Sequence, residues 1–208
     1  MTPTISYLVT THNEGPIYLT PLINKLLTLK EEDDEIVILD DYSDDQKTID
    51  FLASLGNKVK IVQHHLDKDF ASHKNYGKSN CFKEIVMQID GDELPHDNLV
   101  RCIKEIMLMN PGVEMLRVPR INLVQGLTEE DKNRWGWQVN EKGWINWPDY
   151  QDRVFLNVPE IGWVNKVHEK ITGHVKHAEL PAVEDYSLIH LKSIDRQRKQ
   201  NEFYSTIN

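Results

Sequence analysis

Two spacings of apolar residues alternate along the first half of the chain. Short runs of β-branched and aliphatic residues predict four strands, at positions 4–10, 35–40, 58–64 and 85–90. Apolar residues near helical spacing predict four helices after these strands, at positions 16–29, 46–56, 71–85 and 98–109. Strands that alternate with helices in this way predict a mainly parallel sheet with helices on both faces, a Rossmann-like α/β domain.

The pattern changes after residue 113. The sequence there predicts strands at 113–124 and 151–157, a polar, tryptophan-rich segment at 125–150, and a polar helix at 193–208. We expect the tryptophan-rich segment to form a flap beside the sheet. At 208 residues the chain is long enough for one domain, which we divide into halves at residues 1–112 and 113–208.

Composition and charge narrow the functional classes. With 39% hydrophobic and 27% charged residues, the chain has the composition of a folded globule. The net charge of -9 argues against nucleic-acid binding through a broad basic surface, although "RQRKQ" at 196–200 could supply a small basic contact. No run approaches the roughly 18 apolar residues of a membrane span, and no signal-peptide pattern opens the chain. We expect a cytoplasmic protein, with the periphery of the inner membrane, or a host cytoplasm for a viral protein, as alternatives.

Three of the predicted strands end in polar residues. These are Thr10, Thr11 and His12 after the first strand, Asp40 and Asp41 after the second, and Asp90 and Asp92 after the fourth. Ligands of open α/β sheets bind beyond the carboxyl ends of the strands, which is where these side chains should gather. Each residue type alone is common in turns, so it is their coincidence that predicts a ligand site.

The stretch "IDGDELP" places three carboxylates within four residues. Asp90, Asp92 and Glu93 repel one another unless a cation lies among them or all of them face water. The stretch is therefore either a metal site or a solvated turn. A Mg²⁺ or Mn²⁺ ion could bind both the aspartates and a nucleoside diphosphate, and so stabilise the diphosphate as a leaving group. Gly91 would let the backbone pass close to a ligand, while Glu93 and Pro95 are expected at the start of the next helix.

Several motifs carry a resemblance to a known family. The segments "YLVTTHNEG", "EIVILDDYSDD", "ASHKNYGKSN" and "MQIDGDE" resemble, in order and spacing, the nucleotide-binding half of family 2 glycosyltransferases, which have a GT-A fold and a DxD motif. The segments "RVF", "WVNKVHEKITG" and "LIHLKSIDRQRKQNEFYS" are similar to the subgroup that includes bacterial lipopolysaccharide core β-1,4-glucosyltransferases. Only the tryptophan-rich segment lies outside the resemblance. The resemblance implies an inverting, Mn²⁺- or Mg²⁺-assisted transferase that moves a sugar from a nucleoside-diphosphate sugar, usually UDP-linked, to a hydroxyl acceptor.

The resemblance also implies which residues bind the nucleotide. Thr10 and His12 would border it, and Asp41 would accept a hydrogen bond from the ring N–H of the base, usually uracil. Lys74, in a "KNYG" match to the family's "RNxG", would take the place of a basic residue near the nucleotide. Tyr42 departs from the family's "DDGS", which has glycine at that position.

The remaining implied roles concern the metal and the reaction. Asp90 and Asp92 would place the metal and the ribose, and His190 would complete the metal shell beside Asp92. An inverting transferase needs a carboxylate that removes the acceptor's proton. Glu169, in the subgroup's "HE" pair, is our candidate for this base, with Asp185 as a weaker alternative. For both His190 and Glu169 the plain alternative is an ordinary packed or surface residue.

The five tryptophans fall within 29 residues, at positions 135, 137, 144, 147 and 163. Core packing would be the default explanation for so large an apolar residue. Most of them, however, have polar neighbours that could not build a core locally. Because sugar rings stack on exposed aromatic side chains, we favour an acceptor-side flap.

Two other classes of function compete with a glycosyltransferase. A nucleotidyltransferase usually has a basic, glycine-rich phosphate loop near the first strand, and "TTHNEGP" contains no Lys or Arg. A non-catalytic carbohydrate-binding protein on the same fold would be expected to lose the metal acids or the base, and this chain keeps both. The acceptor could be a lipopolysaccharide sugar, another glycan, a protein side chain or, less favoured, a hydroxymethylated base of phage DNA. A homodimer could complete its site.

Overall fold

The computed structural model describes residues 2–205, with side chains as far as residue 202. The strands are β1 (Ile5–Thr11), β2 (Glu35–Asp40), β3 (Lys60–Gln63), β4 (Ile85–Asp90), β5 (Glu93–Pro95), β6 (Met115–Gln125), β7 (Ile145–Leu156), β8 (Gly162–Val164), β9 (Lys170–Thr172), β10 (His177–Glu179) and β11 (Leu188–Ser193). The α-helices are α1 (Gly15–Leu29), α2 (Gln46–Ser54), α3 (Phe70–Ser79), α4 (Asp97–Met109), α5 (Glu129–Trp135) and α6 (Ile194–Ser205).

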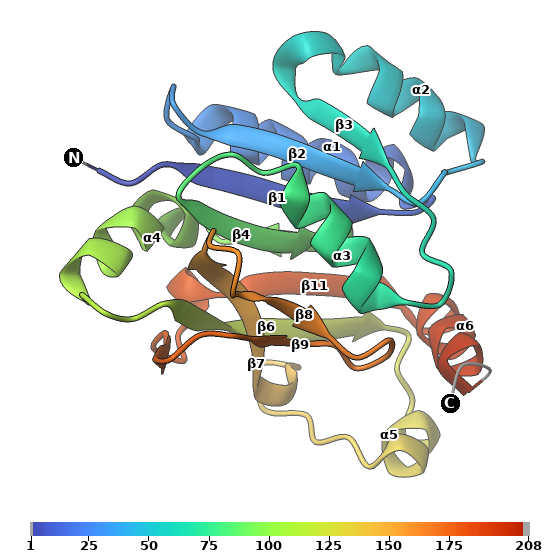
Figure 1. The fold of residues 1–208 in the computed structure, drawn as a ribbon. Coiled ribbons are helices and arrows are strands. Elements are labelled where there is room, and N and C mark those ends of the chain that lie inside the picture. The colour runs from blue at the N-terminus through green and yellow to red at the C-terminus, as the bar shows by residue number, and fades with distance from the viewer. Residues whose placement is uncertain (1, 206–208) are drawn as a thin grey trace.

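One nine-stranded sheet runs through the molecule, in the order β3-β2-β1-β4-β7-β6-β11-β5, and β10 also pairs with β6 (Figure 1). The strands β3, β2, β1 and β4 are all parallel. β7 runs antiparallel to both of its neighbours, and β11 is parallel to β6. The predicted α/β class with a mainly parallel sheet is confirmed, and antiparallel pairs are confined to the second half of the sheet.

Both faces of the parallel part are buried, which explains its nearly continuous apolar strands. Along β1 the residues alternate, so that Ile5, Tyr7 and Val9 face one hydrophobic cluster and Leu8 faces another. The first cluster packs against α1, α2 and α4. The second packs against α3 and the β8–β9 hairpin, seen in front of the sheet in Figure 1. Helices therefore cover both faces, as predicted, with a hairpin added on the α3 side.

The sheet curls back on itself in its second half. β5 follows β4 after only Gly91 and Asp92, yet β5 pairs with β11 at the far end of the strand order. The strands from β4 through β7, β6 and β11 therefore return to the segment that continues β4. This curl brings Asp92 next to side chains of β11.

Several predicted boundaries differ from the structure. The helix predicted over 71–85 ends at Ser79, because the Asn80 N–H bonds to the carbonyls of Gly77 and Lys78 and closes the last turn. The helix predicted to close at Gly56 ends at Ser54 and is followed by a short 3₁₀ turn. The segment predicted as polar at 125–150 contains α5 and the first part of β7, whose Ile145 pairs with Asn122.

The expectation that Glu93 supports the next helix is wrong. Its side chain is fully buried in β5, where it accepts hydrogen bonds from Arg120 (3.0 Å) and Arg153 (2.7 Å). The guanidinium groups of the buried Arg153 and the partly buried Arg120 need a counter-charge there, and this outweighs the weaker attraction of a helix dipole. Pro95 is likewise part of β5, and His96 caps α4 by accepting the Asn98 N–H.

Within residues 2–205, no helix is both long and apolar enough to cross a membrane.

Candidate functional site

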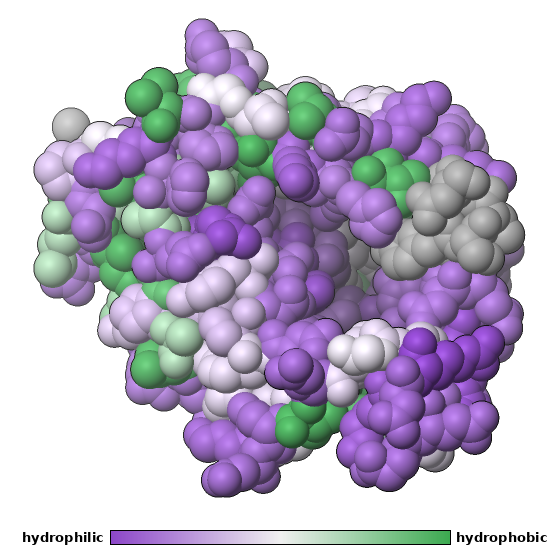
Figure 2. Space-filling view, turned by 90° about the horizontal axis from the view of Figure 1, so that it is seen from below, coloured by the Kyte–Doolittle hydropathy of each residue, from purple (hydrophilic) through white to green (hydrophobic). Residues whose placement is uncertain are grey.

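A cavity of about 920 Å³ lies at the edge of the sheet where β1, β2 and β4 end. Figure 2 shows the molecule hollowed on one face, with mainly hydrophilic residues around the hollow. The cavity brings together the site residues expected from the sequence: Thr10, His12, Asp41, Lys74, Asp90, Asp92, Glu169 and His190. Asp40 does not line the cavity; it is buried and accepts hydrogen bonds from Ser43 and Gln63.

One end of the cavity is formed by the loops after β1 and β2. The Nδ1 atom of His12 lies 2.8 Å from the Asp41 carbonyl oxygen, and the Asp41 carboxylate accepts the Leu66 N–H at 2.8 Å. Tyr42 has φ +46°, in the left-handed region that glycine adopts most readily, and its ring stacks on His65 with centroids 4.0 Å apart. A glycine at this position, as in "DDGS", would satisfy the same backbone without that stack.

Asp90 occupies the floor of the cavity within a dense set of donors. Its carboxylate accepts hydrogen bonds from Arg153 (2.6 Å), Gln88 (2.8 Å) and Thr10 (3.0 Å), and Lys74 Nζ lies 3.7 Å away. Burial alone would raise the pKa of Asp90, but the charges of Arg153 and Lys74 outweigh it and hold the pKa well below its ordinary value. Asp90 is therefore a fixed, ionised group.

Asp92 faces His190 and two cationic side chains. Its Oδ2 atom lies 3.3 Å from His190 Nε2, 3.2 Å from Arg196 and 3.6 Å from Lys192. Burial acts to raise the pKa of Asp92, but the hydrogen bond from His190 and the nearby charges lower it further than burial raises it. The other ring nitrogen of His190, Nδ1, lies 2.8 Å from Asn122 Oδ1, which fixes the orientation of the imidazole.

The Asp92–His190 pair could supply two ligands to a divalent cation. If Nδ1 of His190 donates to Asn122, Nε2 is the atom left to bind a metal, and an oxygen–imidazole pair suits Mn²⁺. Among the described residues there is no cluster of three or more His, Cys, Asp or Glu side chains able to hold a metal. The residues thus fit a cation whose remaining ligands come from a bound phosphate group, and not a metal centre built by the protein alone.

Glu169 reaches the cavity from the loop between β8 and β9. Its Oε1 atom accepts a hydrogen bond of 2.6 Å from Lys74 of α3. Lys74 in turn approaches Asp90, so the predicted base, the predicted basic residue and the first aspartate form one chain of contacts. The alternative base, Asp185, does not line the cavity and instead contacts His96 (3.7 Å) and Asn98 (3.0 Å).

Glu14 lines the cavity although the sequence did not indicate it, and so does Arg196, which the sequence marked only as part of the basic stretch at 196–200. One Glu14 oxygen accepts hydrogen bonds of 2.5 Å from Thr11 and from the His12 N–H, and the other lies 3.2 Å from Arg196. Burial raises the pKa of Glu14 in spite of these contacts. Arg196, in α6, bridges Glu14 and Asp92, and both of these residues are far from Arg196 in the sequence. No local pattern could have revealed this bridge.

A second unpredicted group lies on β6 and β7. Asp149 accepts hydrogen bonds from Arg120 (2.7 Å), Asn122 (2.8 Å) and Gln151 (2.8 Å). Burial opposes its ionisation, but the Arg120 charge and these hydrogen bonds hold its pKa below the ordinary value. The sequence did contain a signal for this group, because Asp149, Gln151 and Arg153 alternate along the chain and alternate residues of a strand share a face. In the structure all three line the cavity.

The tryptophans divide into two groups. Trp163 is buried in the core, where it meets Phe155 edge-on with centroids 5.1 Å apart, so the prediction of a flap is wrong for this residue. Its strand β8 packs on α3, and that placement could not be seen from its polar neighbours. The other four are half-buried and form two pairs, Trp135 with Trp137 (4.6 Å) and Trp144 with Trp147 (4.7 Å). Of the four, Trp137 lines the cavity.

Comparisons with known proteins identify relatives of the chain. The model of glycosyl transferase family 2 matches residues 6–165. A curated Escherichia coli protein, UDP-Gal:alpha-D-GlcNAc-diphosphoundecaprenol beta-1,3-galactosyltransferase, is 23% identical over 118 residues, which are 55% of this chain and 43% of that protein. The chain therefore spans less than half the length of this relative.

Solved structures share the fold. Residues 1–349 of S. aureus TarS superpose with a TM-score of 0.62 at 15% identity, covering 90% of this chain and 60% of that one. A second structure of S. aureus TarS gives a TM-score of 0.50 at 21% identity, covering 61% of this chain and 23% of that one. At this level of identity the likeness concerns the fold, and the predicted GT-A architecture is confirmed.

Proposed function

The chain belongs to glycosyl transferase family 2, and on that premise we propose that it transfers a sugar from a nucleoside-diphosphate sugar to a hydroxyl acceptor, with inversion and with the help of Mn²⁺ or Mg²⁺. A UDP-linked donor is favoured, since the name of the E. coli relative contains UDP-Gal. The observation that carries the proposal is the pairing of Asp92 with His190, 3.3 Å apart, in the same cavity as Asp41 and Lys74.

The donor would lie along the sheet edge. Asp41 and His12 would bind the base, Thr10 would border the nucleotide, and Asp90 would bind the ribose with Lys74 nearby. Arg196 and Lys192 would contact the diphosphate next to Asp92. A divalent cation held by Asp92 and His190 would neutralise charge on the leaving diphosphate.

The acceptor's proton must be removed as its oxygen attacks the anomeric carbon. We propose Glu169 for this step, since it is a carboxylate of the cavity wall within hydrogen-bonding distance of Lys74. Replacing Glu169 with Gln should lower kcat while donor binding stays intact.

Other readings receive less support. A nucleotidyltransferase would need a basic phosphate loop after β1, and a non-catalytic protein would have no use for a complete set of cavity acids. A cytoplasmic location and a homodimer stay predictions from the sequence.

The test is thermal unfolding with a panel of UDP- and GDP-sugars, each with and without Mn²⁺. A bound donor raises the melting temperature, and a ligand at 100 times its Kd stabilises by about 2.7 kcal/mol. We expect a shift with at least one nucleotide sugar that is larger with Mn²⁺ and is abolished in Asp92→Asn, whereas Asp185→Asn keeps it. No shift with any nucleotide sugar would refute the donor assignment. A shift in melting temperature that neither Mn²⁺ nor a chelator changes would refute only the proposed role of the metal.

A further inference from the structure

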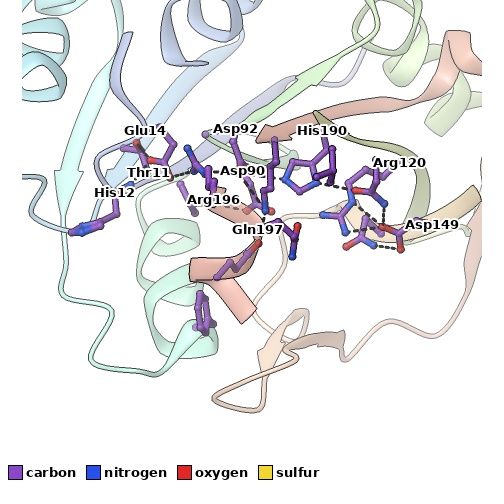
Figure 3. A pocket seen from close by; sticks show the side chains of 18 of the residues that line it. Thr11, His12, Glu14, Asp90, Asp92, Arg120, Asp149, His190, Arg196 and Gln197 are labelled. Carbon is purple, nitrogen blue, oxygen red and sulfur yellow. Dashed lines mark hydrogen bonds and ion pairs between the residues drawn. The ribbon is translucent and has the colours of Figure 1, made fainter. Parts of the chain in front are cut away.

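The cavity extends well beyond the residues assigned to the donor. In the order of the sheet, β7 lies three strands from β2, which corresponds to about 14 Å at the usual strand spacing. In Figure 3, His12 lies on one side of the site and Asp149 on the other, with Asp92 and His190 between them. If the base lies against Asp41, the end at Asp149 lies on the far side of the proposed cation pair from the nucleotide.

An aromatic wall adjoins the start of β7, the strand that carries Asp149, because the residue after Trp137, Gln138, exchanges two hydrogen bonds with Asn146 of β7 (2.8 and 2.9 Å). Trp137 lines the cavity, and its ring contacts Trp135 with centroids 4.6 Å apart. Its backbone N–H donates to the Lys132 carbonyl (2.9 Å) directly after Gly136, which closes α5 in the left-handed conformation with φ +65°. The end of α5 therefore fixes the position of Trp137, and Trp137 presents a pre-positioned aromatic surface.

A fixed carboxylate belongs to the same end. Arg120 and Asn122 both donate to Oδ2 of Asp149, and Gln151 donates to Oδ1. The carboxylate is partly exposed to the cavity and can accept a hydrogen bond from a hydroxyl group there. Asn146, near the start of the same strand, adds a polar side chain to the cavity lining.

We propose that the space between Trp137 and Asp149 is the acceptor subsite and that the acceptor is a sugar. A pyranose ring has an apolar C–H face, which packs on an aromatic ring, and a rim of hydroxyl groups, which suits carboxylate and amide side chains. A hydroxylated DNA base could also stack on Trp137, but this end of the cavity contributes a carboxylate to the lining and the chain carries a net charge of -9. The assignment rests on the proposed transferase function.

The chain offers a matched pair of variants to test it. Trp137→Ala removes the aromatic wall, whereas Trp144→Ala removes an equally half-buried, paired tryptophan of the same segment that lies outside the cavity lining. The probes are the methyl glycosides of glucose, galactose and N-acetylglucosamine, and an oligonucleotide containing hydroxymethylcytosine. Each is assayed as an acceptor by release of the nucleoside diphosphate, using the donor found by thermal unfolding.

We expect at least one glycoside to accelerate release, and Trp137→Ala to raise its KM about tenfold, in keeping with a lost aromatic contact. Trp137→Phe should restore most of the affinity, Trp144→Ala should match the unaltered protein, and the donor-induced thermal shift should be the same in all of them. Asp149→Asn should also raise the acceptor KM.

The inference is wrong if the donor binds but no glycoside accelerates release of the nucleoside diphosphate, if only the oligonucleotide accelerates it, or if Trp137→Ala and Trp144→Ala behave alike. A drop in kcat with unchanged KM in Asp149→Asn would overturn its binding role, and absence of donor binding would instead remove the proposed function.

Discussion

Arg153 Nη2 lies 2.6 Å from Asp90 Oδ2, and the same guanidinium group also contacts Glu93 at 2.7 Å. The two partners of Arg153 are therefore the last residue of β4 and the first residue of β5. Burial opposes the charge of Arg153, but the two carboxylates raise its pKa above the ordinary value, so it remains a cation. The group that positions the first aspartate of the Asp-Gly-Asp triplet is thus a buried residue from the middle of β7.

Replacing Arg153 with Met should cost about 3–5 kcal/mol in the free energy of unfolding, because it removes the cation that the two carboxylates share and leaves Glu93 with Arg120 alone and Asp90 with the more distant Lys74. Urea denaturation at neutral pH measures this loss. Arg153→Lys keeps the charge and should lose less. A cost below about 1 kcal/mol for the Met variant would show that Asp90 and Glu93 are not held in this way.

Gly91→Ala should weaken donor binding through steric crowding. A Cβ atom at this position would lie 2.9 Å from the Thr10 carbonyl oxygen and 3.2 Å from the Glu14 side chain. The Thr10 backbone or the backbone of the turn must then move, at a cost of about 1–3 kcal/mol, and Asp90 and Asp92 move with the turn. The measurements are the melting temperature and the donor-induced shift. Unchanged values for both would contradict the close packing of this turn.

Arg196→Gln should increase the affinity for Mn²⁺ in the absence of any nucleotide. Arg196 bridges Asp92 and Glu14 at 3.2 Å each, and its positive charge opposes a cation at Asp92. Electron paramagnetic resonance of free Mn²⁺ during a titration gives the affinity directly. The control is Arg198→Gln, which alters a cation of the same helix that contacts Asp131 instead. Equal affinities in the two variants would show that Arg196 does not compete with the metal.

Glu14 should make the folded state less stable as the pH rises. Burial raises its pKa above the ordinary value of 4.5, so the folded chain holds this proton more tightly than the unfolded chain does. Its favourable contribution is complete below the ordinary pKa and is lost as the pH rises through the folded value. The unfolding free energy of Glu14→Gln, relative to that of the unaltered protein, should therefore increase as the pH rises from about 4 through the raised pKa of Glu14. A difference independent of pH would contradict the raised pKa.

The two cysteines should differ in reactivity. Burial raises the pKa of Cys81 to about 12, so almost none of this thiol is ionised at pH 8. Cys102 is only partly buried. We expect a thiol reagent such as iodoacetamide to modify Cys102 in the native protein and Cys81 only after unfolding. Mass spectrometry of the labelled peptides distinguishes the two, and rapid labelling of Cys81 in the native state would be incompatible with its packing.

Strand positions were predictable because they depend on local pattern. The bounds predicted for 35–40 and 85–90 agree with β2 and β4, both of which are apolar runs buried on two faces. The end of α3 was missed because Asn80 stops the helix while apolar residues continue, and one of them, Phe82, is 73% exposed.

Site residues at the carboxyl ends of β1, β2 and β4 were predictable because a parallel sheet places such ends at one edge. Glu93 was misread because its partners, Arg120 and Arg153, come from strands that follow it much later in the chain. Asp149 was missed for a similar reason, since its contact with Arg120 depends on the pairing of β6 with β7. Long-range pairings of charge leave no trace in a local window of sequence.

The curl that pairs β5 with β11 also sets the time at which the proposed donor site can exist during synthesis. Asp92 and His190 are almost a hundred positions apart, and β11 must be in place before they meet. A nascent chain that has reached β5 already carries both aspartates, but neither the imidazole nor the basic side chains of α6. A chain that stops before residue 190 therefore holds the acids of the triplet and lacks the partners of Asp92, so an unfinished copy could not hold the proposed cation through Asp92 and His190.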